Sequence, residues 1–399
     1  MFILSISENI LFFIAGIGAL QGILLAGLLY FHPKSDRSVN KFLALYIVGT
    51  SIIMITAQVQ QILSWQKSFF MAPFPFLTGP LLYLYVRSFK ETITWRRALP
   101  HLVPFLLAFF VFYRHFSFMA GVDPNATNFP KEALYHPVTV TLILVRYAHL
   151  ILYYFLSRRA LTSYQKSIKH LFSETSRIDL GWVKLLINGF LLVVVVTLLI
   201  YPLILKYPEQ VEFFMVINMA VATPYIYLAT FKGVTQPTIW QVQSGTNKDE
   251  LVKEMNEAEE VEMYVTHPEK PKNQKIGLDD DKVDLIITKV RAVMELEKLY
   301  QESELTLQEI SDKIQFPSYQ VSQAINEGMK KNFYDLINSY RVEEAKRLLL
   351  NPDKANYTIL SVGFEAGFNS KTTFNTVFKK FTGLTPTAFR DQQKVALVS

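Results

Sequence analysis

The stretch TILSVGFEAGFNSKTTFNTVFKKFTGLTPTAFR, Thr358 to Arg390, predicts two short helices separated by a tight turn. Its first helix is expected from Thr358 to Ala366. Gly367 supplies the turn, because glycine adopts a positive φ without a steric penalty. The order of helix, turn and helix is typical of a DNA-binding helix-turn-helix motif.

The second helix of this stretch opens at Asn369 or Ser370 and stops at Gly383. Its apolar side chains recur at i, i+3, i+4 and i+7, which predicts a buried stripe of Phe374, Val377, Phe378 and Phe381. The opposite face is cationic and rich in hydrogen-bond donors, namely Lys371, Thr372, Asn375, Thr376 and Lys379. Such a face suits a helix that lies in the major groove of DNA.

A second copy of the pattern lies upstream, in LTLQEISDKIQFPSYQVSQAINEG. Thr306 and Glu309 form a capping box for its first helix, and Pro317 with Ser318 begins its second. That second helix turns Val321, Ala324 and Ile325 inward and Tyr319, Gln320, Ser322, Gln323 and Asn326 outward. Between the two copies, NFYDLINSYRVEEAKRLLL predicts one long amphipathic helix that holds them at a fixed separation.

Residues 282–392 resemble the DNA-binding domain of AraC/XylS-type transcription regulators, above all in the strings YRVEEAKRLL and GFNSKTTFNTVFKKFTGLTPTAFR. The resemblance implies that two recognition helices, Ser318 to Glu327 and Ser370 to Phe381, enter successive major grooves. Two residues depart from the family pattern. Pro317 replaces a frequent capping serine, and Gly363 replaces a small packing alanine, so we expect each helix to be slightly loosened.

The expected DNA contacts divide into two classes. Base edges are assigned to Lys371, Thr372, Asn375 and Thr376 in the second motif and to Gln320, Ser322, Gln323 and Asn326 in the first. Ser318, Tyr319, Ser370 and Thr373 complete the expected DNA-binding set, while Lys330, Lys331, Lys379 and Lys380 are expected to meet phosphates. A merely solvated polar face would explain one motif, but two copies on a shared linker helix favour DNA binding.

The rest of the chain has the composition of a membrane protein. Hydrophobic residues make up 50% of the sequence, and its mean hydropathy is +0.21. A membrane helix needs about 20 apolar residues. Seven runs approach that length: Asn9 to Phe31, Phe42 to Leu63, Phe69 to Phe89, Leu99 to Phe118, Pro137 to Leu156, Trp182 to Leu205 and Val211 to Phe231. Prolines interrupt the third run.

The distribution of basic residues predicts the orientation, because Lys and Arg collect in cytoplasmic loops. The odd-numbered loops are basic, with Lys34, Arg37, Lys41, Arg87, Lys90, Arg96, Arg97, Arg158, Arg159, Lys166, Lys169 and Arg177. The even-numbered loops and their flanks offer only Lys67, Arg114, Lys131 and Lys206. We therefore expect a multi-pass protein of the bacterial inner membrane, with its amino terminus outside and its carboxyl terminus in the cytoplasm.

The expected fold class is all-α. A seven-transmembrane-helix bundle spans residues 1–234, a polar acidic linker with one short helix spans 235–280, and a cytoplasmic double helix-turn-helix domain spans 281–393. The net charge of +6 lies mainly in the loops of the bundle. It therefore reports membrane topology, and the DNA argument rests on the local lysines of the recognition helices.

No catalytic motif is present, and the chain has no cysteine, so we expect neither enzyme activity nor a cofactor or metal. The unusual group inside a predicted span is Arg146, with His149 and Tyr153 on roughly the same helix face. These three residues are candidate ligand-binding residues. The alternative is an arginine held by backbone carbonyls or by amides such as Asn188 or Asn218, with a purely structural role.

The sequence thus predicts a membrane-bound, sequence-specific transcription regulator that couples a membrane or extracytoplasmic signal to promoter binding. Its expected partners are double-stranded promoter DNA, the lipid bilayer, a second copy in a homodimer, RNA polymerase and an unidentified small ligand or signal. The alternative is a membrane receptor or transporter whose cytoplasmic helical domain regulates through protein contacts.

Overall fold

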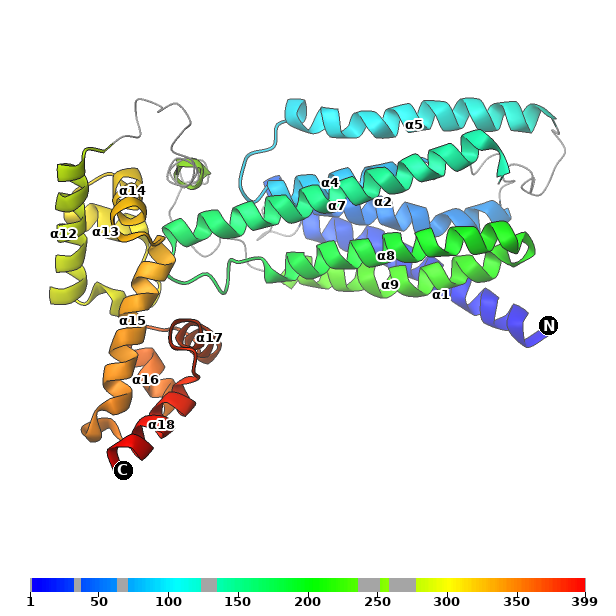
Figure 1. Ribbon diagram of the computed structural model, residues 1–399. Coiled ribbons are helices and arrows are strands. Elements are labelled where there is room, and N and C mark those ends of the chain that lie inside the picture. Colours follow the sequence, from blue (N-terminus) through cyan, green and yellow to red (C-terminus); the bar gives the residue numbers. More distant parts are fainter. Residues whose placement is uncertain are drawn as a thin grey trace. The chain divides into compact units, whose positions relative to one another are not determined.

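The computed structural model describes residues 2–31, 37–62, 71–122, 135–235, 252–257 and 278–398, and in these ranges the chain is helical without a β-strand (Figure 1). The chain divides into two compact units. The first contains Met1–Thr162 and Leu180–Thr238, and the second contains Ser163–Asp179 and Ile239–Ser399. Most of the expected linker, 235–280, lies outside the described residues, and the expected domain boundaries remain predictions.

The first unit is a bundle of long helices. They are α1 (Phe2–Phe31), α2 (Arg37–Ile62), α4 (Pro75–Arg87), α5 (Trp95–Val122), most of α7 (Pro137–Leu171), α8 (Gly181–Lys206) and α9 (Val211–Thr235). Helix α2 packs against α1, α4 and α9, and α9 also packs against α8. The hydroxyls of Tyr46 on α2 and Tyr225 on α9 lie 2.5 Å apart, which joins the two helices by a hydrogen bond.

Small residues let α1 approach its neighbours closely. A Cβ atom on Gly22 would lie 2.3 Å from the Ser51 hydroxyl of α2, and one on Gly18 would lie 3.2 Å from Thr223 of α9. Larger side chains at these positions would push the helices apart. The small-residue face of α1 therefore packs within the bundle.

Among the residues that the structure describes, five helices of this unit are long and apolar enough to cross a membrane, over Arg37–Thr56, Trp95–His115, Pro137–Leu171, Gly181–Lys206 and Phe213–Gly233. Their outer side chains are apolar as well as exposed: on α5, Leu107 is 62% exposed and Phe110 63%. Helix α4 has 13 residues, or about 20 Å, less than the hydrocarbon thickness of a bilayer. The number of seven spans therefore remains a prediction.

The second unit contains the predicted double motif. Its helices are α12 (Asp280–Leu296), α13 (Leu307–Ile314), α14 (Ser318–Met329), α15 (Phe333–Leu350), α16 (Ile359–Glu365), α17 (Lys371–Thr382) and α18 (Pro386–Val398). A further short helix, 252–257, lies within the acidic run where one was expected. Capping side chains begin most of these helices, and the predicted capping box of Thr306 and Glu309 is confirmed at α13.

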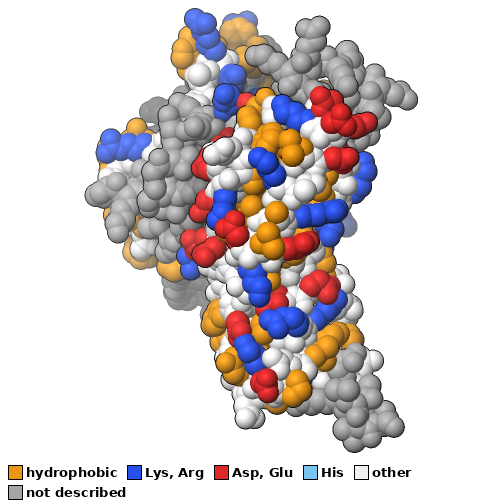
Figure 2. Space-filling view, turned by 90° about the vertical axis from the view of Figure 1, so that its left-hand side faces the viewer, with side chains coloured by type: hydrophobic (Ala, Val, Ile, Leu, Met, Phe, Trp, Pro, Cys, Tyr) orange, Lys and Arg blue, Asp and Glu red, His pale blue; other side chains and the backbone are white. Residues whose placement is uncertain are grey.

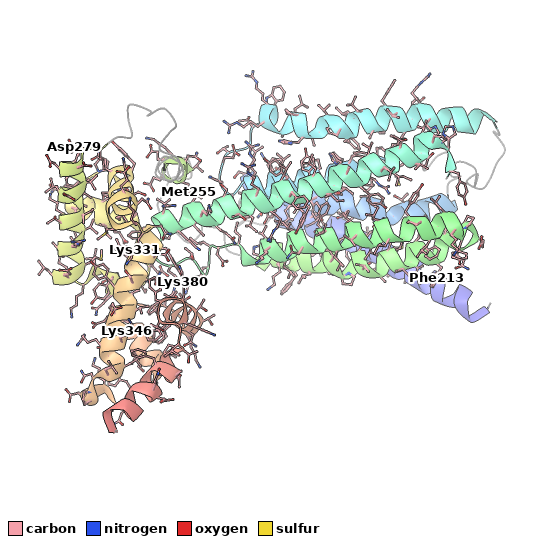
Figure 3. The ribbon with its side chains drawn as sticks, in the orientation of Figure 1. Phe213, Met255, Asp279, Lys331, Lys346 and Lys380 are labelled. Atoms are coloured by element: carbon pink, nitrogen blue, oxygen red, sulfur yellow. The ribbon has the colours of Figure 1, made fainter. Side chains whose placement is uncertain are left out.

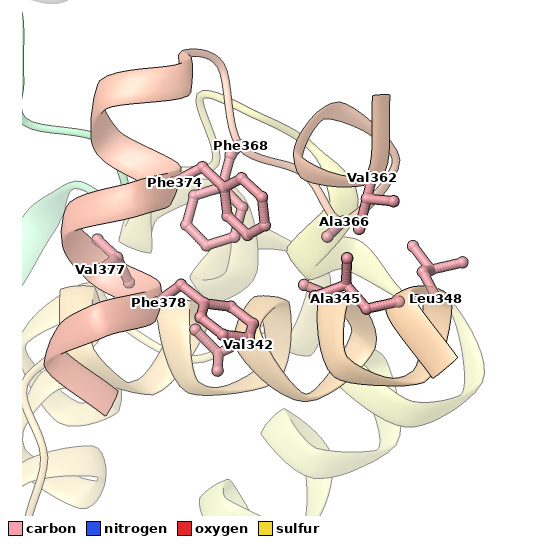
Figure 4. Packing of buried hydrophobic residues seen from close by; sticks show 10 residues of the cluster. Val342, Ala345, Leu348, Val362, Ala366, Phe368, Phe374, Val377 and Phe378 are labelled. Atoms are coloured by element: carbon pink, nitrogen blue, oxygen red, sulfur yellow. The ribbon is translucent and has the colours of Figure 1, made fainter. Parts of the chain in front are cut away.

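One hydrophobic cluster joins the second motif to the linker helix (Figure 4). It unites Val342, Ala345 and Leu348 of α15, Val362 and Ala366 around α16, and Phe368, Phe374, Val377 and Phe378 around α17. Gly363 of α16 belongs to this contact, because a Cβ atom there would lie 2.7 Å from the Phe374 ring. The glycine thus has a packing role that the sequence did not indicate.

Candidate nucleic-acid interface

The second motif has the turn and caps expected of a helix-turn-helix. Gly367 lies between α16 and α17 with φ of +97°, and Gly383 ends α17 with φ of +79°. The Ser370 hydroxyl accepts a hydrogen bond from the Thr373 backbone N–H at 3.1 Å and donates one to the Thr373 hydroxyl at 2.9 Å. Ser370 and Thr373 therefore form the cap that fixes the start of α17, and Thr373 is buried.

The outer face of α17 is open to solvent. Lys371, Thr372, Thr376 and Lys379 are exposed, and Asn375 is half-buried. Among the described residues, no carboxylate forms an ion pair with Lys371 or Lys379. Lys380, labelled in Figure 3, pairs instead with Asp335 at the start of α15 at 2.6 Å. The outer face of α17 is therefore accessible to DNA without rearrangement. The ion pair of Lys380 links α17 to the linker helix α15.

The first motif differs, because part of the outer face of α14 is buried. Ser322 and Gln323 were expected to point outward to bases, yet they are only 3% and 1% exposed. The Gln323 amide donates to Glu327 at 2.9 Å, and its carbonyl oxygen has no hydrogen-bond partner among the described residues. Gln323 therefore cannot reach a base edge in this arrangement, and its expected solvent exposure was wrong.

The other residues expected to bind DNA at this motif are partly accessible. Tyr319 and Gln320 are half-buried and hydrogen-bonded to each other at 3.0 Å, and the Ser318 hydroxyl donates to Gln308. Lys330 and Lys331 are exposed in the turn between α14 and α15, where Lys331 donates to the Ser339 hydroxyl at 3.1 Å (Figure 3).

Residues 163–179, the last turns of α7 and the segment after it, pack on this unit. The Asn326 amide of α14 and the His170 ring nitrogen Nδ1 lie 3.4 Å apart. Phe172 forms an isolated antiparallel bridge with Thr306, and the Ser173 N–H donates to the Leu305 carbonyl at 3.1 Å. His170, Phe172 and Ser173 are themselves buried. The end of α7 therefore contacts both the first recognition helix and the segment that precedes α13.

Arg341 of α15 holds this contact together and is fully buried. Its guanidinium donates to the carbonyls of Tyr300 at 2.8 Å and Glu302 at 2.7 Å, and to the Ser173 hydroxyl at 3.0 Å. Burial lowers the pKa of Arg341 to about 10, so the group remains charged at neutral pH. Sequence reasoning missed this residue; the only signal was an arginine among the buried positions of the linker helix.

The face of the second unit that carries α12 differs in charge from the outer face of α17. The face that carries α12 shows basic and acidic side chains side by side (Figure 2). Helix α12 itself contains Asp280, Asp281 and Asp284 together with Lys289 and Arg291. DNA is attracted by clustered positive charge. The acid-free face of α17 is therefore better suited to DNA than the face around α12.

The three candidate ligand residues of α7 separate into two sites of the first unit. Arg146 lines a cavity with Tyr147 and Leu150. His149 and Tyr153 instead lie in an aromatic cluster, with ring centroids 4.8 Å apart, and the Tyr153 hydroxyl lies 2.8 Å from His101 Nδ1. Both ring nitrogens of His149 are buried without a hydrogen-bond partner among the described residues. The structure therefore does not bring the predicted trio together.

Residues 310–392 match the family described as a helix-turn-helix domain. The second unit contains a helix-turn-helix domain of the AraC type. An uncharacterized HTH-type transcriptional regulator of Staphylococcus aureus strain COL is similar over 118 residues with 30% identity, covering 30% of this chain and 14% of that protein. A regulator of the same description from strain N315 has the same identity and coverage.

The chain thus spans about 14% of the length of these relatives. No solved structure matches it significantly. The matches are to regulators of transcription and not to enzymes. The family match concerns the C-terminal part of the chain, and the membrane-type helices lie outside it.

Proposed function

We propose that the protein is a membrane-bound, sequence-specific transcription regulator that couples a membrane or extracytoplasmic signal to promoter binding. The observation that carries the proposal is the exposed, acid-free face of α17, positioned by Ser370 and the buried cluster on α15. Lys371, Thr372, Asn375 and Thr376 read bases there, while Lys379 contacts phosphate. The five apolar helices hold this domain at the inner membrane, on its cytoplasmic side.

We further propose that α7 carries the signal between the two units. Helix α7 is continuous from Pro137 to Leu171, and it contributes residues to both units. Its last turns contact Asn326 of the first recognition helix. DNA and residues 163–179 therefore compete for α14, and a signal that shifts α7 changes the affinity of the protein for its full site.

A homodimer completes the proposal. One helix-turn-helix domain buries little surface on DNA, and a second domain held nearby in the membrane raises the effective concentration of the pair. The bound dimer then acts on RNA polymerase at the promoter.

The test uses the full chain in lipid nanodiscs and a library of random DNA duplexes. We expect selective enrichment of one sequence. The double variant Lys371→Ala, Asn375→Ala should lose that selectivity, since these side chains face base edges. Lys346→Ala is the matched control, because it removes a positive charge from α15, where Lys346 pairs with Glu343 at 2.8 Å.

Selection that survives in the double variant, or the absence of any enriched sequence at low salt, would contradict DNA reading by α17. In that case the domain acts through protein contacts, and the chain is a receptor or a transporter. Uptake of substrates into sealed vesicles would then be the next measurement.

A further inference from the structure

The first unit contains a partly open cavity of about 360 Å³, lined by residues of α2, α4, α7, α8 and α9. Most of its wall is apolar, including Ile53, Phe190 and Phe214. Among the described residues, Arg146 is the one charged side chain that lines it. An arginine stays protonated in proteins. The cavity therefore combines a permanent positive charge with a large apolar surface.

Several neutral polar groups of the wall already donate hydrogen bonds within the protein. The Tyr225 hydroxyl donates to the Leu186 carbonyl at 3.1 Å, and the Thr197 hydroxyl donates to the Val193 carbonyl at 2.7 Å. The Asn218 amide donates to Thr197 at 2.6 Å. A bound molecule thus gains little from these three groups as donors, and Arg146 offers the strongest donor for its polar part.

Arg146 has donors to spare. It contacts Tyr147: the guanidinium donates to the Tyr147 hydroxyl at 3.3 Å and lies 4.9 Å from the ring centroid. No described carboxylate forms an ion pair with it, and the predicted spans contain no Asp or Glu except Glu212 at the edge of the last. Neither Asn188 nor Asn218 is bonded to it among the described contacts. An uncompensated charge at this depth of a membrane is costly, so an anion that pairs with it would bind favourably.

We propose that the cavity binds an amphipathic monoanion, with its carboxylate or similar head group on the Arg146 guanidinium and its apolar body against Ile53, Phe190 and Phe214. The proposal rests on the proposed signal-sensing function and names the chemical class of its signal. A water occupies about 30 Å³ of liquid, so the cavity accommodates roughly a dozen groups of that size. Decanoate is an anion of this size.

The composition of the wall excludes other classes of ligand. A cation would be repelled by Arg146 and would find no carboxylate among the described lining residues. A dianion would leave one negative charge without a partner in an apolar wall. A neutral molecule of the same shape would fit the apolar surface but would leave Arg146 uncompensated. The charge of the head group is therefore the property to test.

The experiment measures equilibrium binding of radiolabelled decanoate to the full chain in phosphatidylcholine nanodiscs. Decanol and decyltrimethylammonium serve as neutral and cationic competitors of equal chain length. We expect decanoate to bind saturably and the two competitors to displace it at least about tenfold more weakly than unlabelled decanoate, as loss of a charge-assisted hydrogen bond predicts.

Three variants locate the site. Arg146→Gln should weaken decanoate binding about tenfold, whereas Arg146→Lys should retain most of it. Ala222→Phe fills the cavity without a change of charge and should abolish binding, because Ala222 lines the wall. Arg158→Gln is the matched control, since Arg158 lies on the same helix but outside the cavity lining. If Arg146→Gln does not fold, the site is tested by the other two variants: decanoate should still bind to Arg146→Lys and should not bind to Ala222→Phe.

Equal binding to the wild type and to Ala222→Phe would overturn the proposal, as would displacement by decanol as strong as by decanoate. Displacement of decanoate by phosphatidylglycerol in the bilayer would support the site and assign it to a membrane lipid; without displacement, a free anion is the ligand. Selective DNA binding is measured on the same nanodiscs. If decanoate binds through Arg146 but does not change the affinity for DNA, the ligand site is supported. The coupling between this site and DNA binding is then refuted.

Discussion

Arg341 and Ser173 are separated by 168 residues in the sequence, yet the Arg341 guanidinium donates to both the hydroxyl and the backbone carbonyl of Ser173, at 3.0 and 3.4 Å. The same guanidinium also donates to the carbonyls of Tyr300 and Glu302. One buried side chain therefore joins three segments: the linker helix α15, the turn before α13, and the segment that follows α7. The DNA-binding unit is incomplete without residues from the loop between two apolar helices.

Arg341→Ala should destabilise the second unit by about 3 kcal/mol, because it leaves several buried carbonyls without a donor. Ser173→Ala removes one acceptor and should cost only about 1 kcal/mol. Hydrogen exchange of residues 299–306 in the full chain measures both effects. Lys346→Ala is the control on the same helix, because Lys346 pairs at 2.8 Å with Glu343, which is 70% exposed, and a loss below about 1 kcal/mol is expected. Similar exchange in Arg341→Ala and Lys346→Ala would refute the role of Arg341 as a clamp.

Gly363→Ala should destabilise the second motif, although alanine is the better helix former by about 1 kcal/mol. The new Cβ atom would lie 2.7 Å from the fully buried Phe374 ring, and overpacking of this kind costs about 1 to 3 kcal/mol. Gly363→Ala combined with Phe374→Leu relieves the contact and serves as the control. A higher thermal stability of Gly363→Ala than of the wild type would show that helix propensity outweighs the packing.

The pair of Glu344 and Arg347 on α15 should make stability depend on acid pH. The hydrogen bond from Arg347 is the largest cause that holds the pKa of Glu344 below its usual value of 4.5. The ionised carboxylate therefore stabilises the folded state above about pH 4.5, and this contribution is lost as the pH falls through the lowered pKa. We expect the difference in hydrogen exchange of α15 between the wild type and Glu344→Gln to shrink on acidification. A difference that stays constant from pH 7 to strongly acid pH would contradict the assignment.

The elements of the double motif could be predicted because each depends on local chemistry. Thr306 with Glu309, Ser370 and the glycines 367 and 383 lie within a few residues of the helices they begin or end. The buried stripe of α17 follows from helical periodicity alone. The same locality explains why the exposure of Lys371, Thr372, Thr376 and Lys379 was predicted correctly, whereas Thr373 is buried in the cap.

The contacts of residues 163–179 could not be predicted from the sequence, because no periodic pattern links Ser173 to Arg341 or His170 to Asn326. Helix α7 was expected to end near Leu156, but it continues to Leu171, about 22 Å further. Its last turns are polar enough to look like a cytoplasmic loop. The burial of Gln323 follows from tertiary packing on the outer face of α14, which a helical wheel assigns to solvent.

The covered α14 and the open α17 should give the two motifs unequal weight in DNA binding. In the enriched duplex, each half-site is scrambled in turn. The half-site of α17 is the one whose scrambling does not further weaken DNA binding by the Lys371→Ala variant. For the wild-type chain, we expect loss of the α17 half-site to weaken binding by about a hundredfold or more, since each base mismatch costs about 1 to 3 kcal/mol. Loss of the α14 half-site should weaken it far less, because Ser322 and Gln323 are buried.

Variants that detach the end of α7 should abolish this asymmetry. His170→Ala removes the side-chain contact to Asn326, and Phe172→Ala removes the buried ring beside the backbone bridge to Thr306, so both half-sites should then contribute to affinity. Arg159→Ala is the matched control, because Arg159 is exposed on the same helix and belongs to the first unit. A wild-type chain that already reads both half-sites equally would show that residues 163–179 do not compete with DNA. If the two half-sites contribute equally only in the His170→Ala, Phe172→Ala variant, the end of α7 is the element through which the first unit controls DNA binding by α14.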